Sequence, residues 1–260
     1  HKGNRIFAPA CTYICGKGKL RGGGFLKGKW MCAILCAATG VFFLFGLLTS
    51  PTVVHVFGNG ESLPVLVIDA GHGGFDGGAV GVNGTSEQDI NLSISRSVQA
   101  LSGFFGYPVT MTRSDEQALD YQQGRSVREN KVADIKARER ITNEVKNPIF
   151  LSIHLNKFED PKYFGAQVFY SKNNEQSQTL AEKMQETLIS GIQNHNIRRA
   201  KPAAAGIYLM KKLQCPAIIV ECGFLSNPQE EQLLCEVEYH KRLAVCIFHG
   251  YQTYLNENPI

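Results

Sequence analysis

Four residues spread over the middle of this 260-residue chain carry side chains that could hold and use a metal ion. His72 lies in the segment IDAGHGG, Glu87 in SEQD, His154 in LSIHLN and Glu221 in VECGF. Two imidazoles and one carboxylate are a common ligand set for a catalytic zinc ion with one coordination position left open. A second carboxylate can then act as a general base toward water. Together the four residues predict a metal-dependent hydrolase.

Each of these residues also has a simpler structural interpretation when it is taken alone. A histidine in an apolar strand, such as His154, is more often a hydrogen-bonded core residue than a metal ligand. Glu87 opens an expected helix, where a carboxylate interacts favourably with the helix dipole. Glu221 ends an apolar run, and a carboxylate is costly to bury there without a partner or a function. Asp69 poses the same problem, and it could orient a histidine ligand through a hydrogen bond.

The elements that must position these side chains alternate between apolar strands and amphipathic helices. Residues 114–130 are polar and lack clear periodicity, which predicts an exposed loop that either lines a groove or is a tolerated surface insertion. The alternation predicts one α/β domain with a twisted, mostly parallel or mixed sheet of about six strands and helices on both faces. Ligands bind at the carboxyl ends of strands in such sheets, which is where His72 and His154 lie. The predicted strands are 65–69, 108–113, 149–155, 166–170, 206–210 and 217–220, and the predicted helices are 87–102, 132–145, 175–192, 228–235 and 239–255.

The N-terminal part divides into three segments by charge and hydropathy. Residues 1–30 contain seven Lys and Arg and no Asp or Glu, and residues 31–49 are uncharged and mostly apolar. The apolar run is about long enough to cross a bilayer as a helix. Its basic flank predicts a cytoplasmic tail, a membrane anchor at 31–49, a linker at 50–63 and an extracytoplasmic domain at 64–260. The alternative is a cleaved signal segment and a secreted domain, although no clean A-x-A cleavage site is present.

Charge and cysteine content argue against two kinds of binding, to nucleic acid and to a structural zinc ion. Residues 31–260 carry 20 Lys and Arg against 23 Asp and Glu, a net charge of −3 that argues against nucleic acid as a partner. The absence of a CxxC pair argues against a structural zinc site. The cysteines after the apolar run are either small buried apolar residues or include one disulfide, which an oxidising compartment would permit. These are Cys215, Cys222, Cys235 and Cys246.

The segments around the four residues resemble one family of cell-wall enzymes. From about residue 64 to residue 255 the chain is similar to the zinc-dependent N-acetylmuramoyl-L-alanine amidases of the amidase-3 class. The segment IRRAKPAAAGIYLMKK, the GAQVFY strand and the lack of a wall-binding module look most like the germination-specific CwlD branch, which acts on spore cortex. The segments that carry the family resemblance are IDAGHGG, SEQDINL, TRSD, RERITN, LSIHLN, GAQVFY and VECGFLSNP.

This resemblance implies a metal site and a reaction. His72, Glu87 and His154 would bind one zinc ion per chain. Glu221 would activate the attacking water or protonate the leaving amine. The bond cleaved would join the lactyl carbonyl of N-acetylmuramic acid to the amine of L-alanine in peptidoglycan.

The resemblance also places less certain residues near the cleft. Asn156 and Arg138 fall on family positions that could bind substrate, although Arg138 could instead be a structural ion-pair residue. Ala70 stands where the family usually has proline, which should alter the rigidity of the turn and not the ligands. Cys222 follows Glu221 and is expected to be buried; a side chain pointing into the cleft would put the ligand assignment in doubt.

Other functions stay open from the sequence. A vegetative amidase for cell separation or wall turnover would carry the same motifs as a spore enzyme. A zinc peptidase of stem peptides would share the ligand types but not the order of these motifs. A membrane-anchored wall-binding protein would not need all four residues, which are intact here. The small surface around the cleft would suit an activating or recruiting partner protein.

Overall fold

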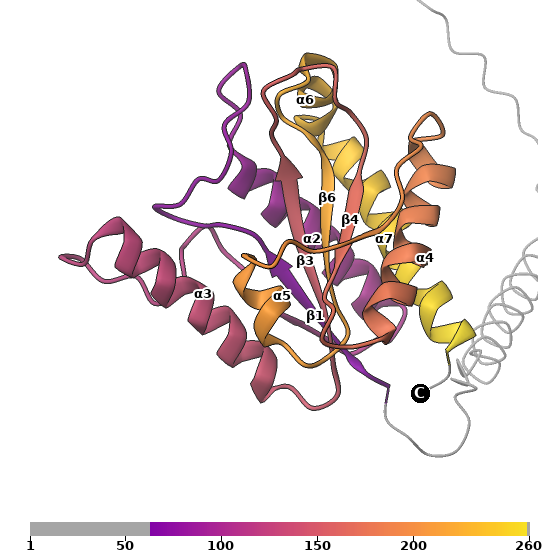
Figure 1. Cartoon of the computed structure of the whole chain (residues 1–260), viewed down its shortest axis with the longest axis horizontal. Helices are drawn as coiled ribbons and strands as arrows, with labels where there is room; N and C mark the ends of the chain where they lie inside the picture. Colours follow the sequence, from indigo (N-terminus) through magenta and orange to yellow (C-terminus); the bar gives the residue numbers. More distant parts are fainter. Residues whose placement is uncertain (1–62, 259–260) are drawn as a thin grey trace, which may run out of the picture. The chain divides into compact units, whose positions relative to one another are not determined.

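A six-stranded sheet forms the centre of this computed structural model, which describes residues 63–258 (Figure 1). The strands lie in the order β2-β1-β3-β6-β4-β5, and all neighbours are parallel except β4 and β6. The mostly parallel sheet of an α/β domain is therefore confirmed. The strands are β1 (Val65–Ala70), β2 (Val109–Met111), β3 (Pro148–Asn156), β4 (Gln167–Tyr170), β5 (Lys201–Pro202) and β6 (Ala217–Phe224).

Helices cover both faces of this sheet, as the sequence predicted (Figure 1). Helices α2, α4 and α7 pack on one face, α3 and α5 pack on the other, and α6 follows the end of β6. The helices are α2 (Glu87–Phe104), α3 (Val127–Glu144), α4 (Gln176–Ile192), α5 (Tyr208–Lys212), α6 (Pro228–Leu234) and α7 (Val237–Glu257).

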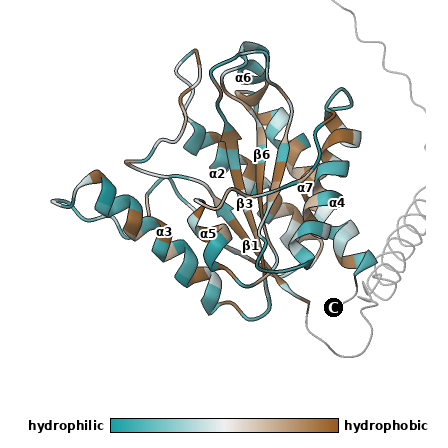
Figure 2. Cartoon of the chain, in the orientation of Figure 1, coloured by the Kyte–Doolittle hydropathy of each residue, from teal (hydrophilic) through white to brown (hydrophobic). Residues whose placement is uncertain are grey.

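Alternation along the central strands sends side chains into two separate cores. In β3, Ile149, Leu151 and Ile153 face the helices α2, α4 and α7, whereas Phe150 faces α3 and α5. The central strands are mostly apolar, whereas the outward-facing helix surfaces carry many polar residues (Figure 2). Continuous apolar runs are what strands buried on both faces require. The same alternation places Cys222 in the larger core with no exposed surface, as expected.

Two local predictions were wrong. The segment 206–210 is not a strand: it overlaps the short helix α5, and the sixth strand is β5. A short apolar run has no periodicity that separates a strand from a buried helical turn. The predicted loop also ends earlier than residue 130, because α3 begins at Val127 after a capping box in which Ser126 and Glu129 exchange hydrogen bonds.

The predicted tail at 1–30 and apolar span at 31–49 lie outside the described residues, as does the linker except for its last residue. Among the helices that the structure describes, none is long and apolar enough to cross a membrane. The four cysteines within the described range are all free.

Candidate active site

The predicted residues meet at one edge of the sheet. His72 follows the end of β1, and His154 lies near the end of the adjacent strand β3. Glu221 lies in β6 directly opposite His154 in the strand register. Glu87 is the first residue of α2. Because β1, β3 and β6 are parallel neighbours, their carboxyl ends bring the four segments together where α/β sheets bind ligands.

Three of these residues form a group that could hold a metal ion. One ligand atom each from His72, Glu87 and His154 lies within 4.8 Å of the others. His72 Nε2 is 3.3 Å from Glu87 Oε2, and His154 Nδ1 is 3.0 Å from Glu87 Oε1. Ligand atoms bonded to tetrahedral zinc at ordinary lengths are roughly 3.3 Å apart. The donor atoms therefore have the chemistry of a zinc site, and both histidine–carboxylate distances are close to the spacing of its ligands.

Glu87 is held in place by hydrogen bonds to both carboxylate oxygens. The backbone N–H of Ala79 donates to Oε2 at 2.7 Å, and the backbone N–H of Leu155 donates to Oε1 at 3.0 Å. The side chain of Asn91, one helical turn later in α2, also donates to Oε1 at 3.2 Å. The carboxylate is buried, so these bonds fix it between the two imidazoles.

Hydrogen bonds within the group shift the pKa values of His72 and Glu87 so that each charged form is stabilised. Burial alone would lower the pKa of His72, but hydrogen bonds to Asp76 and Glu87 outweigh it and raise that pKa to about 9. Burial would raise the pKa of Glu87, but hydrogen bonds to His154 and His72 hold it far below its usual value. A permanently ionised carboxylate between two imidazoles is suited to a divalent cation.

His72 itself has a left-handed backbone conformation, with φ of 62°, which is uncommon outside glycine. Two buried arginines hold the carbonyl groups of this turn. Arg113 and Arg138 each donate to Ala70 O at 2.8 Å. Arg113 also donates to Gly71 O at 3.0 Å, and Arg138 donates to His72 O at 2.6 Å. These bonds stabilise the strained backbone of the turn that carries His72.

Two glycines allow the group to pack closely. A Cβ atom on Gly71 would collide with the imidazole ring of His154, and a Cβ atom on Gly78 would lie 2.7 Å from His72 Cδ2. Gly78 also has a φ of +71°. Both positions therefore need glycine, because the proposed metal ligands fill the space that a Cβ atom at either position would take.

Glu221 has the environment of a proton carrier. Its Oε2 atom is buried and has no hydrogen-bond partner among the described residues. Burial, together with the nearby charge of Glu87, raises the pKa of Glu221 to about 7, against opposing effects of His154 and His72. A carboxyl group with a pKa near neutrality can take up and release a proton at the pH of the cell.

The sequence between residues 66 and 253 matches the Amidase_3 family model, described as N-acetylmuramoyl-L-alanine amidase. The chain belongs to this amidase family. It is 34% identical over 193 residues to the germination-specific N-acetylmuramoyl-L-alanine amidase of Bacillus subtilis, an alignment that covers 74% of this chain and 80% of the relative. It is 25% identical over 249 residues to the amidase AmiA of Escherichia coli, covering 76% of this chain and 81% of AmiA.

A solved structure agrees with this assignment. The amidase has a TM-score of 0.72 and 38% identity to the CwlD amidase of Clostridioides difficile, solved in complex with the GerS lipoprotein. The match covers 75% of this chain and all of the CwlD chain. Members of the family are peptidoglycan amidases, so the amidase acts outside the cytoplasm on the cell wall.

The structure places the remaining predicted residues of the amidase as follows. Arg138 is buried, and it donates to Asp69 at 2.6 Å and to Asp134 at 2.7 Å. This burial fits the structural ion-pair alternative, and a contact of Arg138 with substrate stays a prediction. Asn156 is the last residue of β3 and is half-buried.

Asp69 is buried beneath the turn of His72. It accepts hydrogen bonds from Thr112 and Ser152 in addition to Arg138. None of these hydrogen bonds reaches His72; Asp69 and the backbone carbonyl of His72 both accept hydrogen bonds from Arg138. The expectation that Asp69 supports a histidine ligand remains a proposal.

Sequence reasoning missed Asn91, Arg113, Asp76 and Lys131 as residues that support the site. Asn91 lies four residues after Glu87 in a predicted helix, so its contact could have been anticipated. Arg113 lies in the TRSD segment that carried the family resemblance. Lys131 gave no local signal, because its contact depends on how α3 packs.

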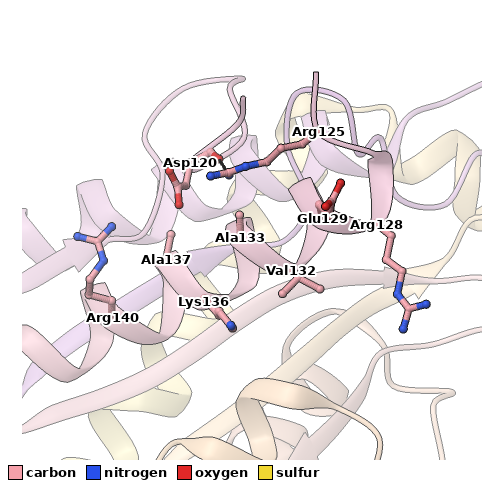
Figure 3. A pocket seen from close by; sticks show the side chains of 9 residues that line it. All are labelled: Asp120, Arg125, Arg128, Glu129, Val132, Ala133, Lys136, Ala137 and Arg140. Carbon is pink, nitrogen blue, oxygen red and sulfur yellow. Dashed lines mark hydrogen bonds between the residues drawn. The ribbon is translucent and has the colours of Figure 1, made fainter. Parts of the chain in front are cut away.

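A separate hollow of about 490 Å³ lies along α3. Figure 3 shows Arg125, Arg128, Lys136 and Arg140 around a floor of Val132, Ala133 and Ala137. None of the three metal-ligand candidates lines it. It is therefore distinct from the site at the sheet edge.

Proposed function

We propose that this amidase hydrolyses the bond between N-acetylmuramic acid and L-alanine with one zinc ion bound by His72, Glu87 and His154. The observation that carries the proposal is the meeting of three ligand atoms within 4.8 Å beside a buried carboxyl group. When bound, zinc would polarise the scissile carbonyl group and lower the pKa of a bound water to about 7.

Glu221 is the proton carrier of the proposed reaction. It takes a proton from the attacking water and delivers it to the leaving amine of L-alanine. Its pKa of about 7 suits both steps, because the group can exist in either protonation state at neutral pH. Glu87 and the two histidines keep their positions through the hydrogen bonds of their surroundings, so the carboxyl of Glu221 is the group left free to exchange a proton. Asn156, at the end of β3, is the proposed substrate contact.

The proposed biological substrate is the peptidoglycan of the spore cortex. The support is similarity to a Bacillus subtilis amidase named germination-specific and to CwlD of Clostridioides difficile. The alternative is a vegetative amidase for cell separation or wall turnover, which would carry the same motifs. Deletion of the gene should leave vegetative growth and cell separation intact and block germination; a chain-forming mutant with normal germination would favour the vegetative role.

The proposed location combines sequence and similarity. Residues 1–30 form a cytoplasmic tail, residues 31–49 anchor the chain and residues 50–63 link the anchor to the catalytic domain at 64–260. Because CwlD was solved with a lipoprotein, a lipoprotein on the outer side of the membrane is the proposed activating or recruiting partner. Cell fractionation tests the anchor: an amidase found only in the medium would support a cleaved signal segment instead.

Digestion of purified peptidoglycan by the full chain tests the enzyme function, with products identified by mass spectrometry. Stem peptides that begin at L-alanine should appear, disappear after chelation and return when zinc is added. Glu221→Gln should release them at least about 100-fold more slowly, whereas Glu238→Gln, a change at an exposed carboxylate of α7, should behave as wild type. Activity that survives complete removal of metal would contradict the zinc proposal.

A further inference from the structure

We infer that Asp76 and Lys131 are positioning residues that orient the imidazole of His72 for metal binding through a chain of hydrogen bonds. The inference rests on the proposed zinc site and adds to it a requirement on residues outside the three ligands. Both side chains lie outside the group of three proposed metal ligands.

Asp76 engages the ring nitrogen of His72 that faces away from Glu87. Asp76 Oδ2 is 3.1 Å from His72 Nδ1, while His72 Nε2 is 3.3 Å from Glu87 Oε2. A carboxylate can only accept a hydrogen bond, so Nδ1 must carry the proton that it shares with Asp76. Nε2 faces the Glu87 carboxylate in the same way; when a metal ion replaces the proton on Nε2, the lone pair of Nε2 is directed at the metal while Nδ1–H stays bonded to Asp76.

The position of Asp76 is itself fixed from two directions. Its backbone forms a two-way bridge with Gly73, with hydrogen bonds of 3.0 Å and 2.9 Å. Lys131 Nζ, from helix α3, is 3.0 Å from Asp76 Oδ1. Each carboxylate oxygen therefore has its own partner, with Oδ2 toward His72 and Oδ1 toward Lys131.

Asp76 and Lys131 restrict rotation of the His72 imidazole, which the backbone contacts of the turn do not restrict. The bonds from Arg113 and Arg138 hold the carbonyl groups of the turn, but they do not fix rotation of the imidazole about its own side-chain bonds. A rotated ring would exchange the two nitrogens and place a protonated atom toward the metal. Asp76 prevents this exchange, and Lys131 keeps Asp76 from turning away.

Zinc affinity of the full-length chain tests the inference, measured by competition with a chromophoric chelator. Asp76→Ala should weaken zinc binding about 10- to 100-fold, the usual effect of removing a group that orients a metal-binding histidine. Lys131→Met should weaken it less, and it should have no further effect in the Asp76→Ala background because it acts through Asp76. Lys183→Met is the matched control, since it breaks another lysine–carboxylate pair, with Glu257 at 2.8 Å.

A second measurement separates orientation from general structural damage. Nitrogen-15 NMR of the histidine rings should show His72 of the zinc-loaded wild type with a proton on Nδ1, and this signal should be lost or mixed in Asp76→Ala. If Asp76→Ala does not fold, Asp76→Asn and Lys131→Met carry the same test.

Wild-type zinc affinity in Asp76→Ala, or in both Asp76→Asn and Lys131→Met, would overturn the inference. A loss of affinity in Lys183→Met equal to that in Lys131→Met would overturn the role of Lys131. Failure of the wild-type chain to bind zinc would instead remove the proposed zinc site, and this inference with it.

Discussion

Replacing Gly71 with alanine should remove zinc from this amidase while leaving it folded. Gly71 does not have a positive φ, so alanine meets no backbone strain there. An added Cβ atom would lie 2.7 Å from His154 Nδ1 and still closer to two other atoms of the ring. Nonbonded heavy atoms prefer separations of about 3.5–4.0 Å, so the ring must retreat by roughly 1 Å or more. Metal–ligand distances tolerate only about 0.2 Å.

The ring of His154 has room for this retreat. Its side chain is 25% exposed, so it can turn toward solvent without disturbing the core. The expected result is a loss of zinc affinity larger than the roughly 10- to 100-fold effect of changes outside the ligands. The melting temperature of the metal-free protein should change little.

Bound zinc per chain, measured by elemental analysis and by chelator competition, provides the assay. Gly206→Ala is the matched control, because a Cβ atom there would have no neighbour within 4 Å and its φ is not positive. If Gly71→Ala bound zinc as tightly as Gly206→Ala, the close packing of Gly71 against a metal ligand would be refuted as the reason for glycine at this position.

Three further predictions concern the proton carrier and the buried charges. Glu221→Gln should keep zinc and lose activity by about 10²- to 10⁴-fold; near-normal turnover on peptidoglycan would refute its catalytic role. Arg138→Ala should lower the free energy of unfolding by about 3–5 kcal/mol, since it leaves the buried Asp69 carboxylate uncompensated; a smaller loss in urea titrations would show that the carboxylate finds another partner. Thr112→Val removes a 2.7 Å hydrogen bond to Asp69 and should cost about 1.5–3 kcal/mol at pH 7. Burial raises the pKa of Asp69, but Arg138 and two hydroxyl groups lower it below its usual value. The stabilisation by the ionised Asp69 is therefore complete above about pH 4, and it is lost as the pH falls through the lower pKa of the folded state. If Thr112→Val still cost as much stability at a pH where Asp69 is protonated, the hydrogen bond to the Asp69 carboxylate would be refuted as the cause.

The strand pattern predicted where the catalytic candidates lie because their positions follow from local sequence. His154 lies near the end of one apolar run and His72 follows shortly after another, and such runs form neighbouring parallel strands in an α/β domain. Glu221 stood out for a related reason, since an ionisable group in an apolar strand needs a purpose. Glu87 was recognised through its segment and not through its chemistry, because an acid at the start of a helix is ordinary.

What the sequence did not reveal depends on packing between distant segments. Arg138 lies on a strongly polar helix, and nothing in that pattern shows that its guanidinium is buried against Asp69. Lys131 and Asp76 likewise meet only because α3 lies beside the turn after β1. The prediction of a strand at 206–210 was wrong because its four apolar residues fit a strand and a short buried helix equally well.

The support of His72 shows why these distant contacts matter for chemistry. A histidine with a left-handed backbone costs about 1–3 kcal/mol to hold, so the surrounding structure must supply that free energy. Arg113, from the segment after β2, and Arg138, from α3, supply it through hydrogen bonds to the carbonyl groups of the turn. Since both arginines are buried, this stabilisation depends on the sheet and α3 being correctly packed. The metal site is therefore a property of the whole domain, and substitutions in α3 that touch no ligand should still reduce metal binding.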